Sequence, residues 1–128
     1  MSTIMELLRT PETTTVAVVG ATDRPGKYGG IIYRDLKAKG FTVFGVNPYR
    51  DSVDGDRSYR TLDDLPEAPD LVDYVVPPAR TLEVLQDAER LGYTTAFVQP
   101  GAEDDDVIEF LDDHGFDYLA NTCIMVRS

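Results

Sequence analysis

The hydrophobic positions of the chain form short apolar runs, separated by longer segments in which apolar residues recur at helical spacing. Runs of this kind, without strict alternation, are typical of strands that are covered on both faces of a parallel sheet. The runs are Val16–Val19, Phe41–Val46, Leu71–Val76, Thr94–Val98 and Tyr118–Met125. Helical spacing between them predicts helices over 31–39, 80–91 and the segment that follows Asp104.

Alternation of strands and helices predicts a three-layer, doubly wound α/β domain with a mainly parallel sheet of five or six strands. The length of 128 residues predicts one domain, residues 1–128. A short helix is expected over Thr3–Arg9. The stretch from Tyr49 to Pro69 is rich in Asp, Gly and Pro, and it predicts a loop with one helical turn near Thr61–Leu65.

A glycine-rich loop follows the first strand, at Gly20, Gly26, Gly29 and Gly30. A strand, loop and helix in this order direct backbone N–H groups and the positive end of a helix dipole at the space beyond the strand. Because both favour an anion, the expected ligand group is a phosphate. The spacing fits neither GxGxxG nor the P-loop. Alternatively, the glycines only permit a tight turn. If they receive phosphate, a valine at Gly20 should abolish binding and leave the protein folded.

The unusual residues of the sequence stand where the predicted strands end. Ligands of doubly wound sheets bind outside the carboxyl ends of the strands, so these ends predict one shared site. The ends are Gly20-Ala21-Thr22, Asn47-Pro48, Val76-Pro77-Pro78, Gln99-Pro100-Gly101 and Asn121-Thr122-Cys123. After the second strand, Arg50 stands where an NAD domain has an acid, which favours a phosphorylated ribose, as in NADP or coenzyme A.

The amino-acid composition limits the classes of partner that this protein is expected to bind. The formal charge of −11 disfavours nucleic acid and anionic membranes. It also favours a salt-rich cytoplasm, the alternative being an ordinary acidic protein. The one cysteine excludes an internal disulfide, and the first residues do not read as a signal peptide, so a cytoplasmic location is expected. No metal cluster is predicted: His114 is the one histidine, and the acids of 51–64 lack calcium-loop spacing.

Five segments, taken as a set, resemble the small CoA-binding proteins, whose Rossmann-like domain also begins the α subunit of succinyl-CoA synthetase and the ADP-forming acyl-CoA synthetases. The segments are VVGATDRPGKYGG, VFGVNPYR, VDYVVPP, FVQPGAE and NTCIMV. The resemblance extends from about Thr13 to Val126 and implies that the ligand is coenzyme A or an acyl-CoA. Thr122 is a departure, because relatives often carry arginine before the cysteine.

The resemblance implies a role for each strand end. Gly20, Ala21 and Thr22 would meet the CoA phosphates, with charge added by Arg24 and Lys27. Asn47, Pro48 and Arg50 would meet the ribose phosphate or adenine, and Val76, Pro77 and Pro78 would form a wall along adenine or pantetheine. The full predicted set is Gly20, Ala21, Thr22, Arg24, Lys27, Tyr28, Gly29, Asn47, Pro48, Arg50, Val76, Pro77, Pro78, Gln99 and Cys123.

Two of these residues have alternative interpretations. Cys123 is either a small apolar filler or a thiol that could form a mixed disulfide with the cofactor. Gln99 either satisfies local backbone groups or faces the pantetheine arm.

Catalysis has little support in the sequence. There is no Ser-His-Asp set, and His114 does not match the phosphorylated histidine of the acyl-CoA synthetases, which lies outside the domain that this chain resembles. The first hypothesis is therefore a stand-alone CoA-binding module, which could form a homo-oligomer. The alternatives are an NADP-dependent oxidoreductase and a subunit that supplies the CoA site to a separate ligase chain.

Overall fold

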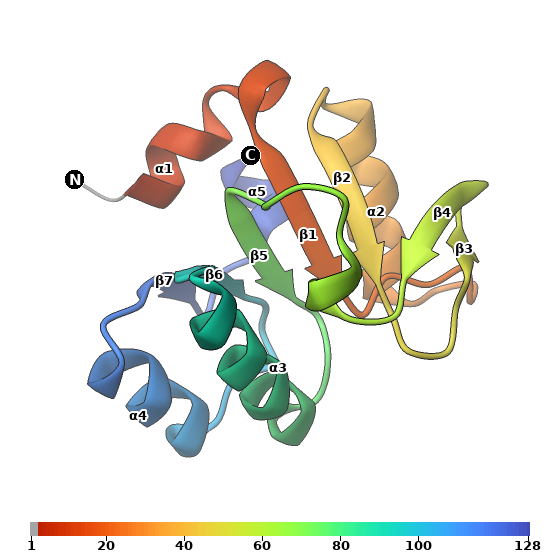
Figure 1. Cartoon of the computed structure of the whole chain (residues 1–128). Coiled ribbons are helices and arrows are strands. Elements are labelled where there is room, and N and C mark those ends of the chain that lie inside the picture. The colour runs from red at the N-terminus through yellow and green to blue at the C-terminus, as the bar shows by residue number, and fades with distance from the viewer. Residues whose placement is uncertain (1–2) are drawn as a thin grey trace.

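A single seven-stranded sheet forms the middle layer of the protein in the computed structural model, which describes residues 3–128 (Figure 1). The strand order is β3-β4-β2-β1-β5-β6-β7, and every pairing is parallel except that of β3 with β4. The strands are β1 (Thr15–Val19), β2 (Thr42–Val46), β3 (Ser52–Val53), β4 (Asp56–Tyr59), β5 (Leu71–Tyr74), β6 (Thr95–Val98) and β7 (Asp117–Ala120).

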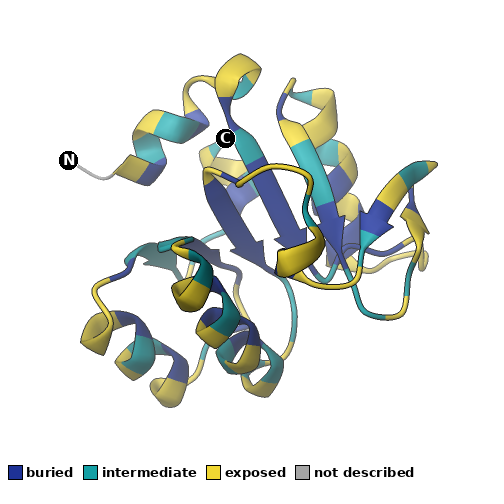
Figure 2. Cartoon of the chain, viewed as in Figure 1, coloured by how far each residue is buried: buried dark blue, intermediate teal, exposed yellow. Residues whose placement is uncertain are grey.

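Helices cover both faces of this sheet, so the predicted three-layer α/β architecture is confirmed. They are α1 (Thr3–Leu8), α2 (Tyr28–Ala38), α3 (Pro78–Leu91), α4 (Asp105–Asp113) and α5 (Ile124–Arg127), with 3-10 turns at Pro11–Thr13 and Leu62–Asp64. One face carries α3 and α4, and the other carries α1, α2 and α5. The central strands are buried on both sides (Figure 2). None of the helices within 3–128 has the length and apolar character to cross a membrane.

The extra strands come from the segment 49–69, which was expected to be mostly loop. Asp54 and Gly55 both adopt left-handed backbone conformations, with φ of 53° and 78°. A two-residue Asp-Gly turn of this kind joins the strands of a tight hairpin, here β3 and β4. β4 then pairs with β2, which extends the sheet beyond the predicted five or six strands.

The end of the chain also differs from the expected strand over Tyr118–Met125. β7 stops at Ala120, and Asn121 turns the chain with a φ of 62°. The following apolar residues form α5, where Ile124 is fully buried against the α1 and α2 face of the sheet. The hydrophobic run alone could not distinguish a strand from this strand, turn and short helix.

Polar contacts fix the β3–β4 hairpin to α2. The Tyr33 hydroxyl donates a hydrogen bond of 2.8 Å to Asp56, and the Lys37 ammonium contacts Asp56 at 2.7 Å and Asp54 at 3.2 Å. These partners hold the pKa of the Asp56 carboxyl below its ordinary value, the Lys37 hydrogen bond having the largest effect. Because the hairpin follows β2 directly, this contact also fixes the loop that leaves β2.

Acidic residues at the start of α4 play the expected capping role. Asp104 accepts a hydrogen bond of 2.9 Å from the Val107 N–H, and Asp105 and Asp106 occupy the first turn. His114 stands at the C-cap, as predicted, where it pairs with Glu89 of α3. The acids follow the preference of the helix dipole for anions at its start.

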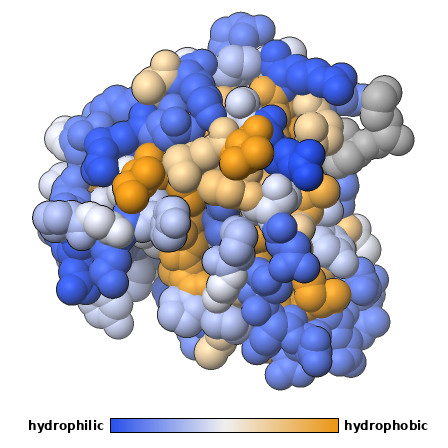
Figure 3. Space-filling model, turned by 180° about the vertical axis from the view of Figure 1, so that it is seen from behind, coloured by the Kyte–Doolittle hydropathy of each residue, from blue (hydrophilic) through white to orange (hydrophobic). Residues whose placement is uncertain are grey.

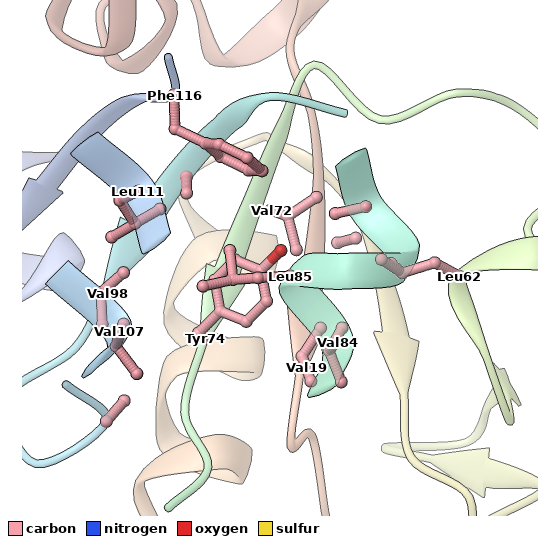
Figure 4. Packing of buried hydrophobic residues seen from close by; sticks show 14 of the residues in the cluster. Val19, Leu62, Val72, Tyr74, Val84, Leu85, Val98, Val107, Leu111 and Phe116 are labelled. Atoms are coloured by element: carbon pink, nitrogen blue, oxygen red, sulfur yellow. The ribbon is translucent and has the colours of Figure 1, made fainter. Parts of the chain in front are cut away.

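Tyr74 is buried in the core between the sheet and α3, and its hydroxyl has no hydrogen-bond partner among residues 3–128 (Figure 4). Leaving a buried hydroxyl unpaired costs stability, so Tyr74→Phe is expected to raise the free energy of unfolding by about 1 kcal/mol. Urea unfolding measures this. Tyr33→Phe is the matched control, since it removes a hydroxyl that has a partner, and it should lower stability. A less stable Tyr74→Phe variant would show that the hydroxyl is satisfied.

Candidate ligand-binding cleft

A cleft of about 1130 Å³ lies at the carboxyl ends of the parallel strands. The chain runs from β1 to β2 on one side and later to β5 on the other side, and the helices α2 and α3 that follow β1 and β5 cover opposite faces. This reversal between β1 and β5 is the topological switch point of a doubly wound sheet. Seen from behind, the hollow between two hydrophilic lobes of the molecule is lined by hydrophobic surface (Figure 3).

The glycine loop closes tightly around the end of β1. Gly20 has a φ of 104°, and a Cβ atom there would lie 2.5 Å from the Val75 carbonyl oxygen. A Cβ at Gly29 would lie 1.9 Å from the carbonyl oxygen of Gly20. The expectation that Gly20→Val leaves the protein folded is therefore wrong, since the new side chain would collide with the backbone of Val75, directly after β5, and with the side chain of Val76.

The Asn47 side chain ties this loop to the end of β2. Its Nδ2 donates a hydrogen bond of 2.9 Å to the Ala21 carbonyl, and its Oδ1 accepts a hydrogen bond of 2.9 Å from the Tyr49 N–H. Both ends of the amide are thus engaged within the protein, although Asn47 also lines the cleft. Asn47 therefore holds the glycine loop in place next to the end of β2.

Two helices begin at the cleft from opposite faces of the sheet. Lys27 is the N-cap residue of α2 and Pro77 that of α3, and neither helix has a side-chain cap hydrogen bond. The first N–H groups of a helix have no acceptor within the helix, so those of Tyr28 and Gly29 at α2 and that of Ala79 at α3 are available to a ligand, Pro78 having none. Since the positive ends of two helix dipoles meet here, the cleft favours an anion.

The charge of the cleft is opposite to that of the protein as a whole. Its lining includes three basic residues, Arg24, Lys27 and Arg80, and one acidic residue, Glu83. Glu83 is paired with Arg80 at 3.0 Å, whereas Arg24 and Lys27 form no ion pair within the described chain. In a protein with 23 acidic residues, this concentration of cations indicates an anionic ligand.

Beyond the glycine loop, the wall of the cleft is apolar and continues to the last helix. Val75, Val76 and Pro77 line its centre, and Cys123 and Met125 line the part next to α5. Cys123 is half-buried. The cleft therefore combines an anion-binding subsite at the end of β1 with an apolar surface at the ends of β5 and β6.

All but two of the residues predicted from the sequence line this cleft. Ala21 is buried beneath it and offers only its carbonyl to Asn47, and Arg50 follows the turn after β2, outside the lining. Contact of these residues with a ligand remains a prediction. Among the other residues at the predicted strand ends, Pro100 and Gly101 line the cleft and Asn121 and Thr122 do not. Additional lining residues are Val19, Ile32, Val46, Tyr49, Val75, Arg80, Glu83, Ala102 and Met125.

The sequence indicated the position of some of these additional lining residues. Arg80 and Glu83 lie in the first turns of a helix that was predicted to begin at the site. Met125 was assigned to a strand, and only the turn at Asn121 brings it to the cleft. Within residues 3–128, no three His, Cys, Asp or Glu side chains gather in a way that could hold a metal ion.

Comparison with known proteins is consistent with this geometry. The family model of the CoA binding domain matches residues 14–128. Among curated proteins, the α subunit of the ADP-forming acetate–CoA ligase II from Pyrococcus furiosus is 26% identical over 124 residues, which cover 88% of this chain but only 27% of that protein.

Solved structures share the fold. A conserved hypothetical protein from Pyrococcus furiosus superposes with a TM-score of 0.86 at 41% identity, covering 90% of this chain and 99% of the other. The dinucleotide-forming acetyl-coenzyme A synthetase 1 from Ca. Korarchaeum cryptofilum has a TM-score of 0.72 at 28% identity, and the match covers 88% of this chain and 27% of the synthetase. The chain thus matches a complete small protein and also one part of much larger enzymes.

Proposed function

Because the chain belongs to the CoA-binding domain family, we propose that it is a non-catalytic module that binds coenzyme A or an acyl-CoA in the cleft at the carboxyl ends of its strands. The observation that carries this proposal is the reversal of charge at the cleft, where cations and uncapped helix ends converge in a protein of net charge −11. The cytoplasmic location and the adaptation to high salt stay predictions that accompany it.

The parts of the cleft fit the parts of the cofactor. Pyrophosphate would lie at the start of α2, against the N–H groups of Tyr28 and Gly29 and beside Arg24 and Lys27. The adenosine end would lie toward β2, where Tyr49 lines the cleft and is 90% exposed. An exposed aromatic ring at a cleft is suited to stacking on a base.

Pantetheine would then extend in the other direction, along the apolar wall across β5 toward β6 and α5. This layout uses the polar side of the cleft for the nucleotide and the apolar side for the arm. It also leaves the thiol or acyl end next to Cys123 and Met125.

Calorimetric titration of the whole chain with CoA, dephospho-CoA and NADP tests the proposal. Molar potassium chloride should be present so that a salt-dependent fold is retained. Binding of CoA that is tighter than binding of dephospho-CoA supports the module. If NADP binds and CoA does not, the protein is better described as an NADP-dependent enzyme, and a hydride-transfer assay follows.

Arg50→Ala should lower the affinity for CoA by about fivefold to tenfold, which is the effect of losing one charge-assisted contact. The affinity for dephospho-CoA should stay within about twofold of the wild type. The reason is that Arg50 stands beside the proposed adenosine end, and the two ligands differ only in the ribose phosphate. Arg57→Ala is a matched control, because Arg57 lies on β4 of the hairpin that follows, over the Tyr59 ring, whereas Arg50 is next to Tyr49, which lines the cleft. Equal losses for both ligands would show that Arg50 does not read the ribose phosphate.

A second candidate role, the CoA-site subunit of a split ligase, is favoured by one comparison. The relative from Pyrococcus furiosus is the α subunit of an ADP-forming acetate–CoA ligase, and this chain spans about a quarter of its length. Purification of the tagged protein from its own cells would test this role. A nucleotide-binding ligase chain that co-purifies in equal amount supports it.

A further inference from the structure

Asp73 is a fully buried carboxyl in the middle of the sheet, one strand away from the cleft wall at Gln99. Its Oδ1 accepts a hydrogen bond of 3.1 Å from Gln99 Nε2, and its Oδ2 has no partner among residues 3–128. It faces the α1, α2 and α5 side of the sheet, because its neighbours Val72 and Tyr74 belong to the core on the opposite side. A buried acid with one neutral partner is costly, so a function for it is expected.

The amide of Gln99 can have only one orientation at this site. Its other end lies 3.3 Å from the backbone nitrogen of Ile124. A backbone N–H can only donate, so the Gln99 oxygen must face Ile124, and the Gln99 NH₂ group must face Asp73. Asp73 supplies the acceptor that the NH₂ group needs when the amide is turned this way.

Gln99 in this orientation supplies the missing cap of α5. Ile124 is the first residue of that helix, and the N-cap residue Cys123 makes no side-chain cap hydrogen bond. A helix of four residues does not hold its position by its own hydrogen bonds. The second anchor is Lys39, whose ammonium donates 2.7 Å to the Met125 carbonyl and 2.8 Å to the Ser128 hydroxyl.

We propose that Asp73 is a positioning residue: by orienting the Gln99 amide it holds the first turn of α5, and with it the cleft wall formed by Cys123 and Met125. The effect on a ligand rests on the proposed function, whereas the effect on the wall does not. In the layout above, this wall meets the thiol or acyl end of the cofactor. Asp73 would then set the contribution of the pantetheine arm to affinity without touching the ligand.

Asp73 can accept the Gln99 hydrogen bond in either charge state. Burial raises the pKa of its carboxyl well above the ordinary value, against the opposing effect of the Gln99 hydrogen bond. A neutral carboxylic acid retains a carbonyl oxygen that accepts from Gln99. Asparagine at position 73 would keep both the size of the side chain and an oxygen that accepts from Gln99. Leucine would keep a similar size but has no acceptor.

The experiment compares Asp73→Asn and Asp73→Leu with Tyr74→Phe, a control on the same strand whose side chain lies on the other face. The first readout needs no ligand: the rate at which 5,5′-dithiobis(2-nitrobenzoate) modifies Cys123, the one cysteine of the chain. The second is the ratio of the affinities for CoA and for adenosine 3′,5′-bisphosphate, which lacks the pantetheine arm.

Asp73→Leu should raise the Cys123 rate by about tenfold and lower the affinity ratio by about tenfold, whereas Asp73→Asn and Tyr74→Phe should stay within about threefold of the wild type. Should Asp73→Leu not fold, Gln99→Met removes the bond to Asp73 together with the bond from Ile124, and it should give the same change in the Cys123 rate. An unchanged Cys123 rate in a folded Asp73→Leu or Gln99→Met variant overturns the proposal. If the wild type binds no CoA, the proposed function fails, and the Cys123 rate still decides the role of Asp73.

Discussion

Gly29→Ala is expected to destabilise the protein by about 3 kcal/mol or more, at the upper end of what overpacking costs. Alanine in place of glycine within a helix ordinarily adds about 1 kcal/mol of stability, so the sign is reversed here. The reason is the backbone: the new Cβ would lie 1.9 Å from the Gly20 oxygen and 2.8 Å from its carbonyl carbon. Gly20 cannot move away easily, because its N–H donates a hydrogen bond of 2.9 Å to the Val46 carbonyl.

Urea unfolding measures the loss of stability, and titration with CoA under stabilising salt measures the accompanying loss of affinity, expected to be at least about tenfold because the start of α2 is displaced from the anion subsite. Gly26→Ala is the matched control in the same loop. A Cβ there meets nothing within 4 Å, so only the left-handed φ of 77° opposes it, at about 1–2 kcal/mol. A Gly29→Ala variant as stable as the Gly26→Ala variant would mean that the loop is not closed against α2.

The central part of the fold could be predicted because it depends on local patterns. The apolar runs of β1, β2, β5 and β6 have no competing interpretation when helices separate them, and the confirmed family resemblance agrees with this reading. The two regions that differed depend on single residues in left-handed conformations, Asp54 and Asn121. The Asp-Gly pair is a known hairpin signal. Asn121 was counted among the strand ends, but nothing in the apolar run after it distinguishes a short helix from a continued strand.

The site was predictable to the extent that strand ends converge. The rule that ligands bind at the carboxyl ends of parallel strands placed residues of β1, β2, β5 and β6 together without any contact information. Contacts between side chains could not be predicted in this way. The bond of Gln99 to Asp73, and the cap that Gln99 gives to α5, depend on the lateral pairing of β5 with β6 and on the turn at Asn121.

The buried acid makes the second large prediction, which concerns stability against pH. The pKa of Asp73 in the folded protein lies well above the value of 3.8 expected for an exposed aspartate, because burial disfavours the charged form. The folded state therefore binds the proton more tightly than the unfolded chain. Its favourable contribution is complete below about pH 4 and is lost as the pH rises through the folded-state pKa, with a slope of up to about 1.4 kcal/mol per pH unit.

Asp73→Asn removes this titration and keeps the acceptor for Gln99. The variant should therefore match the wild type near pH 4 and exceed it increasingly toward neutral pH, as measured by urea unfolding at a series of pH values. Asp56→Asn is the control of opposite sign. The pKa of Asp56 is lowered by Lys37 and Tyr33, so its contribution is present above about pH 4 and lost in acid, and removing it should weaken the protein at neutral pH. A constant difference between Asp73→Asn and the wild type at every pH would show that Asp73 carries the same charge in the folded and unfolded chain, and that the energetic cost of its burial is met by a partner such as a buried water.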